Sequence, residues 1–293
     1  MLTPDAIVKP VIKWSGSKRA VAPELSAHIT PAKRYFEPFI GGGSLLPFRR
    51  VETAIAGDII PELIHLWHLI QNEPELVASE YEKRWILLHT EGHEVYYKIR
   101  ESFNKTKNEF DFLFLTRTCA SGLIRYNHHG EFNNSIHKNR PGIHPKTFRD
   151  VVHKWANYLK GVTFQNTDYR TTLADVTKKD FVFLDPPYGG TKDRYTKTEF
   201  NVNDFYGELE RLNSVGANWI LTFDGTAGNR HYGFDVPKEL YKHRMSIKTG
   251  NSPFTKLMKT HIDAVMESVY FNYQINEIKG NKLTPIVQEY AFV

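Results

Sequence analysis

Six short apolar runs, rich in β-branched and aromatic residues, occur in the two end regions of the chain. They lie near residues 34–40, 53–57, 161–166, 180–184, 218–223 and 264–273. Runs of this length and composition are typical of buried strands. We therefore expect an α/β fold whose strands come from both ends of the sequence.

The middle of the chain has a different pattern. Apolar positions at helical spacing predict helices over residues 62–70, 75–88, 93–103 and 110–118. The next stretch, 122–145, is rich in Asn, His, Gly, Pro and Arg and predicts a loop or hairpin. These patterns divide the chain into an α/β domain formed by 1–60 and 155–293, and a mainly helical insertion at 61–154.

The run at 181–188, Phe-Val-Phe-Leu-Asp-Pro-Pro-Tyr, carries the strongest chemical signal. The strand must end at Asp185, because neither Pro186 nor Pro187 has an N–H to donate. Ligands of open α/β sheets bind at this end of the strands. The Asp185 carboxylate and the Pro186 carbonyl can accept both hydrogens of a planar amino group, while Tyr188 stacks on its ring. The pattern favours transfer to such a group, and a proline-stiffened turn with a capping Asp is the alternative.

A glycine turn follows the first apolar run, within residues 35–44 (Tyr-Phe-Glu-Pro-Phe-Ile-Gly-Gly-Gly-Ser). After Phe39, Gly41 and Gly43 allow the backbone to approach a ligand closely. The third spaced glycine of the dinucleotide fingerprint is missing, so the turn suits a nucleoside cofactor without phosphates. Asp58 closes the next run, where an acid commonly binds a ribose diol, although it can also cap the following helix.

The amino-terminal segment Lys13-Trp14-Ser15-Gly16-Ser17-Lys18 is a basic, glycine-containing loop with one tryptophan. We expect it to close over the charged amino-acid end of the cofactor, with Lys18 pairing the carboxylate of that cofactor. The alternative is a surface turn with an aromatic plug.

In this order, the motifs resemble the DNA adenine methyltransferase (Dam-like) family, the α-group of adenine-specific methyltransferases. The similarity spans residues 9–273 and includes further blocks at 94–97, 103–105, 122–127 and 130–133. It implies a Rossmann-like S-adenosylmethionine-dependent methyltransferase sheet with an inserted, mainly helical DNA-recognition domain. It also implies sequence-specific methyl transfer from S-adenosylmethionine to the 6-amino group of an adenine flipped out of duplex DNA.

The resemblance assigns roles to single positions. Its catalytic motif corresponds to Asp185, Pro186, Pro187 and Tyr188. Its cofactor-binding positions correspond to Trp14, Lys18, Phe39, Gly41, Gly43, Asp58, Ile59, Asp168 and Asp185. Its DNA-binding positions correspond to Lys13, Leu123, Arg125, Tyr126 and Asn127. Arg125 is suited to bidentate contact with guanine in the major groove.

The sequence departs from the family at three positions that bear on the recognition site. Members that methylate GATC carry an aromatic residue and an asparagine where this chain has Ala120 and Ser121. They also carry a proline after the Gly-Glu-Phe-Asn block, where this chain has Asn134 and Ser135. We therefore expect the duplex to be held open differently. GATC is one candidate for the recognised DNA sequence, and these departures leave the choice between GATC and other sequences open.

Composition agrees with a nucleic-acid enzyme. The formal charge is +5 and 41% of residues are hydrophobic, which favours polyanionic partners and a proper core. Cys119 is the single cysteine, so no internal disulfide forms. We find no membrane-span pattern, signal-peptide core or metal-ligand spacing. Together with these features, the resemblance implies a cytoplasmic prokaryotic or phage enzyme that acts on double-stranded DNA without a metal, with a cognate restriction endonuclease as a cellular but not stably bound partner.

Three alternatives stay open at this point. The same class of enzyme acting on cytosine is the nearest, although Asp rather than Ser at position 185 favours adenine. A catalytically silent DNA-binding regulator is the second, and the intact Trp14, Lys18, Asp58 and Asp185 argue against it. A nicotinamide dehydrogenase is the third, and the missing glycine argues against that reading.

Overall fold

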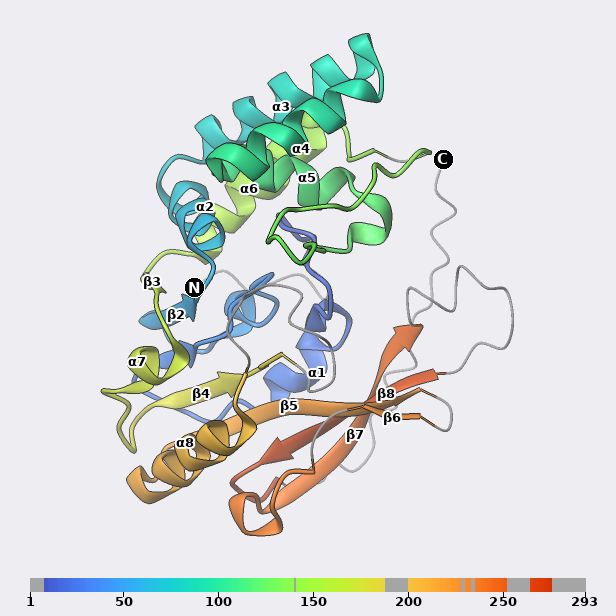
Figure 1. The fold of residues 1–293 in the computed structure, drawn as a ribbon. Helices are drawn as coiled ribbons and strands as arrows, with labels where there is room; N and C mark the ends of the chain where they lie inside the picture. Colours follow the sequence, from blue (N-terminus) through green and yellow to red (C-terminus); the bar gives the residue numbers. More distant parts are fainter. Residues whose placement is uncertain are drawn as a thin grey trace.

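The computed structural model describes residues 8–139, 141–187, 200–227, 230–232, 235–251 and 264–275. These residues form one sheet, in the order β3-β2-β1-β4-β5-β8-β7, with β6 paired to β5 (Figure 1). Its strands are β1 (Tyr35–Glu37), β2 (Ala54–Asp58), β3 (Val162–Asn166), β4 (Phe181–Leu184), β5 (Asn218–Ala227), β6 (Arg230–Tyr232), β7 (His243–Asn251) and β8 (Ala264–Phe271).

Five neighbouring strands, from β3 to β5, run parallel, and β8 is antiparallel to both of its neighbours. All six strands predicted from apolar runs are present. The sequence pattern missed β6 and β7. β7 lies at the edge of the sheet, and few of its residues are apolar, so it gives no continuous apolar run.

The described helices are α1 (Ala22–Ala27), α2 (Pro61–Asn72), α3 (Pro74–Glu91), α4 (Glu94–Thr106), α5 (Glu109–Thr118), α6 (Pro145–Tyr158), α7 (Tyr169–Leu173) and α8 (Val202–Val215). Short 3₁₀ turns are η1 (Lys18–Ala20), η2 (Leu46–Phe48), η3 (Ala120–Gly122) and η4 (Lys238–Leu240). The four predicted helices are confirmed as α2 to α5, each longer at one or both ends than expected. α1, α6, α7 and α8 were not predicted.

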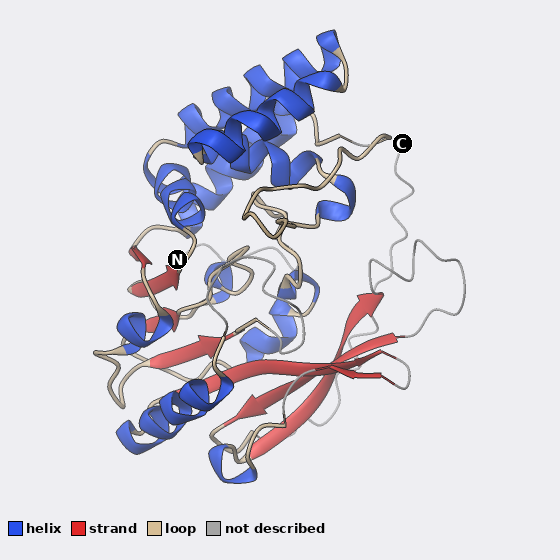
Figure 2. Ribbon diagram, in the orientation of Figure 1, coloured by secondary structure: helices blue, strands red, loops and turns tan. Residues whose placement is uncertain are grey.

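The helices α2 to α6 pack against one another and form a group at one end of the molecule, with the sheet below them in the view of Figure 2. α5 lies inside this group, and its residues from Asp111 to Thr118 are all buried. The Asn108 side chain caps it by accepting from the backbone N–H groups of Phe110 and Asp111. Arg117 donates to the carbonyls of Pro10 and Val11, which attaches the amino-terminal segment to the helical group.

Two hydrophobic cores cover the faces of the sheet, and β4 contributes to both. Phe181 and Phe183 belong to the core that contains Trp67 and Trp155. Val182 and Leu184 belong to the other core. Because side chains alternate between the faces of a strand, a central parallel strand must be apolar at every position. This explains the uninterrupted apolar run that precedes Asp185.

Gly57 in β2 tests the packing between the sheet and α7. A Cβ added there would overlap Oγ1 of the buried Thr172 and lie 3.2 Å from its Cγ2. Gly57→Ala should therefore lower the free energy of unfolding by about 1–3 kcal/mol in urea titrations.

Gly207 in α8 is the matched control, because no atom lies within 4 Å of an added Cβ. Gly207→Ala should stabilise the protein by about 0.5–1 kcal/mol through helix propensity. Equal stability of the two variants would contradict this packing.

Candidate active site

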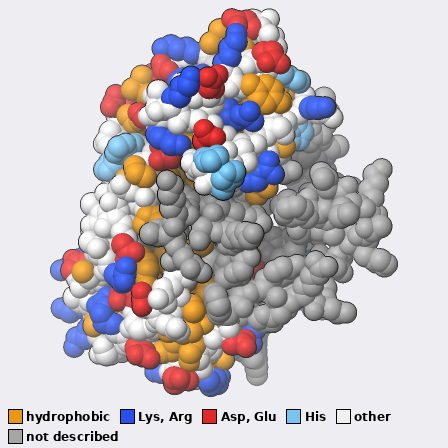
Figure 3. All heavy atoms as spheres, in the orientation of Figure 1, with side chains coloured by type: hydrophobic (Ala, Val, Ile, Leu, Met, Phe, Trp, Pro, Cys, Tyr) orange, Lys and Arg blue, Asp and Glu red, His pale blue; other side chains and the backbone are white. Residues whose placement is uncertain are grey.

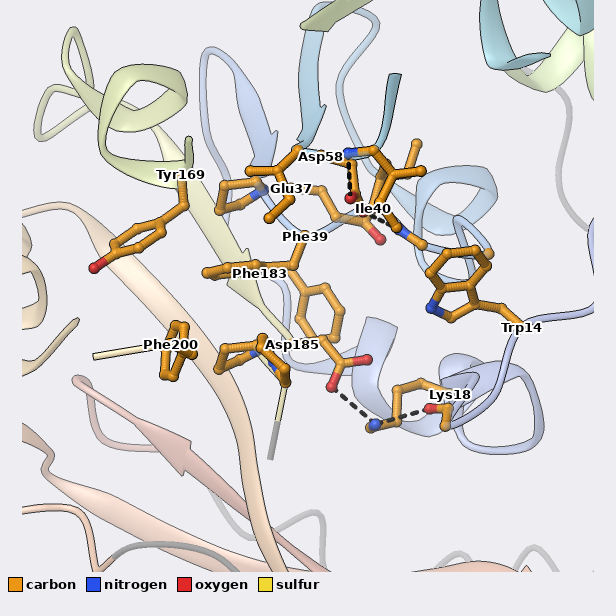
Figure 4. A pocket seen from close by; sticks show the side chains of 18 of the residues that line it. Trp14, Lys18, Glu37, Phe39, Ile40, Asp58, Tyr169, Phe183, Asp185 and Phe200 are labelled. Carbon is orange, nitrogen blue, oxygen red and sulfur yellow. Dashed lines mark hydrogen bonds and ion pairs between the residues drawn. The ribbon is translucent and has the colours of Figure 1, made fainter. Parts of the chain in front are cut away.

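The strand order reverses between β1 and β4, which are parallel neighbours. At such a switch point the loops that follow the two strands separate and leave a crevice at their carboxyl ends. A cavity of about 740 Å³ lies there, and Figure 4 shows side chains pointing into it from both loops. Its wall includes Trp14, Lys18, Glu37, Phe39, Gly41, Asp58, Ile59, Asp168, Tyr169, Asp185, Pro186 and Pro187.

The glycine turn after β1 shapes one wall of the cavity. Gly41 and Gly43 have φ values of 43° and 63°, in the left-handed region that favours glycine. A Cβ at Gly41 would lie 2.6 Å from Nε1 of Trp14, so a side chain would displace that ring. The Gly41 carbonyl accepts from Trp67 Nε1 at 3.1 Å, which anchors the turn to the helical group. The turn therefore brings Trp14 and bare backbone together at the cavity surface.

Asp58, at the end of β2, faces the glycine turn. Its carboxylate oxygens accept from the N–H groups of Gly41 and Ile60, each at 3.2 Å. Burial raises the pKa of Asp58 to about 6, although these backbone hydrogen bonds oppose the shift. Beside it, the Ile59 side chain is 44% exposed at the cavity wall. An acid next to an exposed apolar side chain suits a sugar diol and the flat base attached to it.

Asp185 is held at the end of β4 by one of its two oxygens. Oδ1 accepts from Thr222 Oγ1 at 2.8 Å and lies 2.8 Å from Lys18 Nζ. Oδ2 has no hydrogen-bond partner among the described residues. The side chain is 22% exposed and borders the cavity with Pro186 and Pro187. The carboxylate is thus fixed in direction and keeps one oxygen for a ligand.

Lys18 lies deeper in the site than the sequence suggested. It is 2% exposed, and its ammonium donates to the Gly16 carbonyl at 2.9 Å. The same nitrogen lies 3.5 Å from Oε2 of Glu267 on β8, besides its contact with Asp185 (Figure 4). The amino-terminal motif predicts that Lys18 pairs the carboxylate of a cofactor, whereas its ammonium here faces two carboxylates of the protein.

Glu37 is a second acid that the sequence analysis did not single out. It is 2% exposed at the end of β1, lines the cavity and accepts from the Tyr35 hydroxyl at 3.0 Å. Burial raises the pKa of Glu37 to about 8, and the nearby charge of Asp185 contributes to the shift, while the Tyr35 hydrogen bond opposes it. Glu37 therefore carries a proton over most of the neutral range.

An aromatic cluster closes the side of the cavity near α7. The Phe39 ring lies 5.2 Å from Tyr169 and also contacts Phe200 and Phe205.

Asp168 caps α7 by accepting from the Arg170 N–H at 3.0 Å, and its carboxylate also pairs with the Arg170 guanidinium. Asp168 thus has a structural role in addition to its place in the cavity wall.

None of the five DNA-binding candidates lines the cavity, although Lys13 directly precedes Trp14, which does. Lys13 is on the amino-terminal loop, and burial lowers the pKa of its ammonium, with Arg117 contributing. The other four belong to an irregular hairpin in which Tyr126 bridges to Phe132. Arg125 is exposed, and its Nε donates to Asn133 Oδ1 at 2.8 Å.

Two hairpin residues have visible structural roles. Asn127 Oδ1 accepts from the N–H groups of His129 and Glu131, which builds the turn, and Leu123 is half-buried. On the face seen in Figure 3, acidic and basic side chains are interspersed over the helical group, so the net positive charge is not concentrated there.

Tyr188, the last residue of the expected catalytic motif, lies outside the described residues. Within the described part of the chain, no group of three or more His, Cys, Asp or Glu side chains is arranged to hold a metal ion. In the same ranges, no helix combines the length and apolarity that a membrane span requires.

Thr222 and Glu267 are site residues that the sequence analysis missed. Thr222 carries no motif and reaches Asp185 only because β5 pairs with β4. Glu267 left a signal, because it interrupts an otherwise apolar strand pattern. That signal shows an unusual acid but does not identify Lys18 as its partner.

Comparison with known proteins places residues 14–224 in a family described as D12 class N6 adenine-specific DNA methyltransferase. The Type II methyltransferase M.MjaIII of Methanocaldococcus jannaschii is 29% identical over 277 residues, which cover 82% of this chain and 94% of that protein. The retron Ec67 DNA adenine methylase of Escherichia coli is 32% identical, covering 74% and 78%. A DNA adenine methylase of Vibrio cholerae is 29% identical, covering 66% and 70%.

The raised pKa of Glu37 predicts how stability depends on pH. Between its ordinary value of 4.5 and about 8, the unfolded chain releases the Glu37 proton while the folded chain keeps it. This group therefore makes the wild type less stable as pH rises through that window. Relative to wild type, Glu37→Gln should gain on the order of a few kcal/mol in unfolding free energy between about pH 5 and pH 8.

Urea unfolding at several pH values measures this gain. Glu101→Gln is the control, because Glu101 is exposed and pairs with Lys105 at the surface, so its difference from wild type should stay nearly constant. If the Glu37→Gln difference is also independent of pH, Glu37 is ionised in the folded protein and the account of this acid is wrong.

Proposed function

Because the chain belongs to the D12 class of N6 adenine-specific DNA methyltransferases, we propose that S-adenosylmethionine and the target adenine meet in the cavity between β1 and β4. The protein is thus an adenine-specific DNA methyltransferase, and the proposal concerns which residues perform the reaction. The main support for this proposal is that one cavity is lined by all of these groups. Asp58 and the glycine turn lie on one side of it, and Asp185, whose Oδ2 has no partner among the described residues, lies on the other.

The cavity suits S-adenosylmethionine in size and chemistry. Its volume falls within the range of about 300–1,000 Å³ that is typical of small-molecule sites. We assign the ribose hydroxyls to Asp58, and the adenine of the cofactor to the apolar surface of Ile59 with Asp168 nearby. The bare backbone at Gly41 and the rings of Phe39 and Trp14 complete the binding surface. Gly43, which the family motif also assigned to the cofactor, does not line the cavity and faces Trp67 and Trp155 instead. The loop from Lys13 to Lys18 covers the amino-acid end.

The residues after β4 orient the target amine. Oδ2 of Asp185 accepts one hydrogen of the 6-amino group and the Pro186 carbonyl accepts the other, while Pro187 restricts the direction of that carbonyl. The nitrogen lone pair then points away from both acceptors, toward the cofactor. When bound, S-adenosylmethionine supplies a methyl carbon whose bond to sulfur breaks as the N–C bond forms, with the electron pair leaving on sulfur. The amine gives its second hydrogen as a proton to solvent, and Tyr188 is assigned to stack on the extruded base.

Positioning then supplies most of the rate enhancement, because reacting atoms must approach to roughly 3–3.5 Å in line. The double anchoring of Asp185 Oδ1 by Thr222 and Lys18 supports this role, since it removes rotational freedom from the carboxylate before the substrate arrives. Extrusion of the adenine costs a few kcal/mol of stacking and pairing, which DNA contacts must offset.

We assign residues 1–60 and 155–293 to the catalytic domain and 61–154 to target recognition. Arg125 reads guanine from the exposed hairpin, with Tyr126, Asn127 and Leu123 shaping its support, and Lys13 contacts DNA beside the cofactor loop. The small Ala120 and the serine at 121 leave this chain without the family's aromatic wedge, so GATC is one candidate site among others. The bacterial and archaeal relatives support a prokaryotic or phage setting in the cytoplasm, alone or beside a restriction endonuclease.

Replacement of Asp185 tests the catalytic assignment. Asp185→Ala should abolish transfer of tritium from methyl-labelled S-adenosylmethionine to duplex DNA, because the amine loses its anionic acceptor. Affinity for the duplex, measured by fluorescence anisotropy, should stay within about threefold of wild type because the DNA-contacting side chains are intact.

Asp175→Ala is the matched control, since Asp175 is an exposed acid that pairs with Arg34. That variant should transfer methyl groups at the wild-type rate. Full activity of Asp185→Ala would refute the catalytic role.

Replacement of Arg125 tests the recognition assignment. Arg125→Ala should relax discrimination at one base pair by about 1–3 kcal/mol, because a bidentate contact to guanine is lost. Sequencing of methylated adenines in a random duplex library measures this preference. Arg149→Ala, which removes an arginine paired with Glu82, should keep the wild-type preference. An unchanged preference in Arg125→Ala would exclude Arg125 from base readout.

A further inference from the structure

Glu267 is an acid on the apolar face of β8. Alternate residues of a strand share a face, and its neighbours on that face, Val269 and Phe271, are fully buried in a hydrophobic core. Its cross-strand partner on β7, Ile247, belongs to the same core. Glu267 itself is 8% exposed. A carboxylate in such a place is costly unless a charged group compensates it, and Lys18 Nζ lies 3.5 Å from its Oε2.

Lys18 connects this acid to the reacting centre. Its ammonium lies 2.8 Å from Oδ1 of Asp185, and the lysine is 2% exposed. Both carboxylates are therefore within 3.5 Å of one nitrogen, from which bulk water is nearly excluded. Charges interact strongly in such surroundings because solvent screening is weak. A change of charge at Glu267 must consequently change the electrostatic potential at Asp185, although the two residues come from different strands.

The net charge of this group matters for methyl transfer. The formal charges of Lys18 and Asp185 cancel each other, and the carboxylate of Glu267 adds a negative charge beside the lysine. During the reaction, positive charge moves from the sulfonium to the amino nitrogen. We propose that Glu267 is a positioning residue that acts through Lys18, offsetting the lysine charge so that Asp185 retains its full attraction for the amine. This inference rests on the function proposed above.

The other acid beside Asp185 does not supply this charge. Glu37 faces it from β1, but burial raises the pKa of Glu37 to about 8, so this side chain is largely protonated at neutral pH. Thr222 faces Asp185 from β5 and is uncharged. Glu267 contacts Lys18 directly and can carry the negative charge that balances the lysine.

Glu267→Gln tests the proposal, since it removes the charge and keeps the shape and an acceptor for Lys18. We expect kcat for DNA methylation to fall about tenfold, with the KM for DNA unchanged. Glu267→Asp keeps the charge and should recover most of the lost rate. The matched control is Glu208→Gln, which neutralises another nearly buried acid that pairs with Arg211 away from the cavity, and which should keep the wild-type kcat.

A binding measurement separates charge from shape. S-adenosylmethionine carries a sulfonium, whereas S-adenosylhomocysteine is a neutral thioether at the same position. Calorimetric titration of each ligand into Glu267→Gln should show the affinity for the sulfonium falling about three- to tenfold relative to the thioether, compared with wild type. A purely structural role would weaken both ligands equally.

The outcomes separate this inference from the proposed function. Suppose that the wild type is active but Glu267→Gln keeps the wild-type kcat, or loses affinity equally for both ligands. The role of Glu267 is then refuted, while the proposed function stands. A Glu267→Asp variant no faster than Glu267→Gln does the same, because shape and not charge would then matter. A wild type that binds neither ligand and methylates no adenine refutes the proposed function, and this inference falls with it.

Discussion

The parallel pairing of β1 with β4 is the constraint on which the site depends. It puts the glycine turn that follows one strand and the Asp-Pro-Pro segment that follows the other on the same edge of the sheet. These segments are more than 140 residues apart in the sequence (Gly41 and Asp185), and the helical group lies between them. The crevice exists because the chain leaves β1 and β4 in opposite directions at the point where the strand order reverses.

Three acids around the cavity have different environments, and their differences suit different tasks. Asp58 is a half-buried residue that accepts two backbone hydrogen bonds, and desolvation of its carboxylate raises its pKa to about 6, so it is mostly ionised near neutral pH. Glu37 is buried with only the Tyr35 hydroxyl, and its pKa is raised further, to about 8. Asp185 is 22% exposed, and its Oδ1 is ion-paired with Lys18. The fold thus places a carboxylate paired with lysine at the end of β4 and one held by backbone N–H groups at the end of β2, with a largely neutral acid on β1 between them.

Much of this arrangement was predictable from the sequence. The uninterrupted apolar run before Asp185 predicted a buried strand, and the proline pair predicted its end. Both predictions are confirmed by β4, which contributes side chains to two cores. The glycine turn and Asp58 lie in one cavity wall, as the motif order suggested. Lys18 could not be placed in this way, because its partner Glu267 is 249 positions away by residue number and is brought near only by the pairing of β8 with β5. β7 was missed because an edge strand needs few apolar residues, and Thr222 was missed because a lone threonine carries no pattern.

A crystal structure of the chain with S-adenosylhomocysteine tests the central claim most directly. The account predicts that the ribose hydroxyls of the ligand donate to Asp58 and that its sulfur lies on the side of the cavity occupied by Asp185. A ligand bound away from the carboxyl ends of β1 and β4, or one whose sulfur is remote from Asp185, would contradict the account.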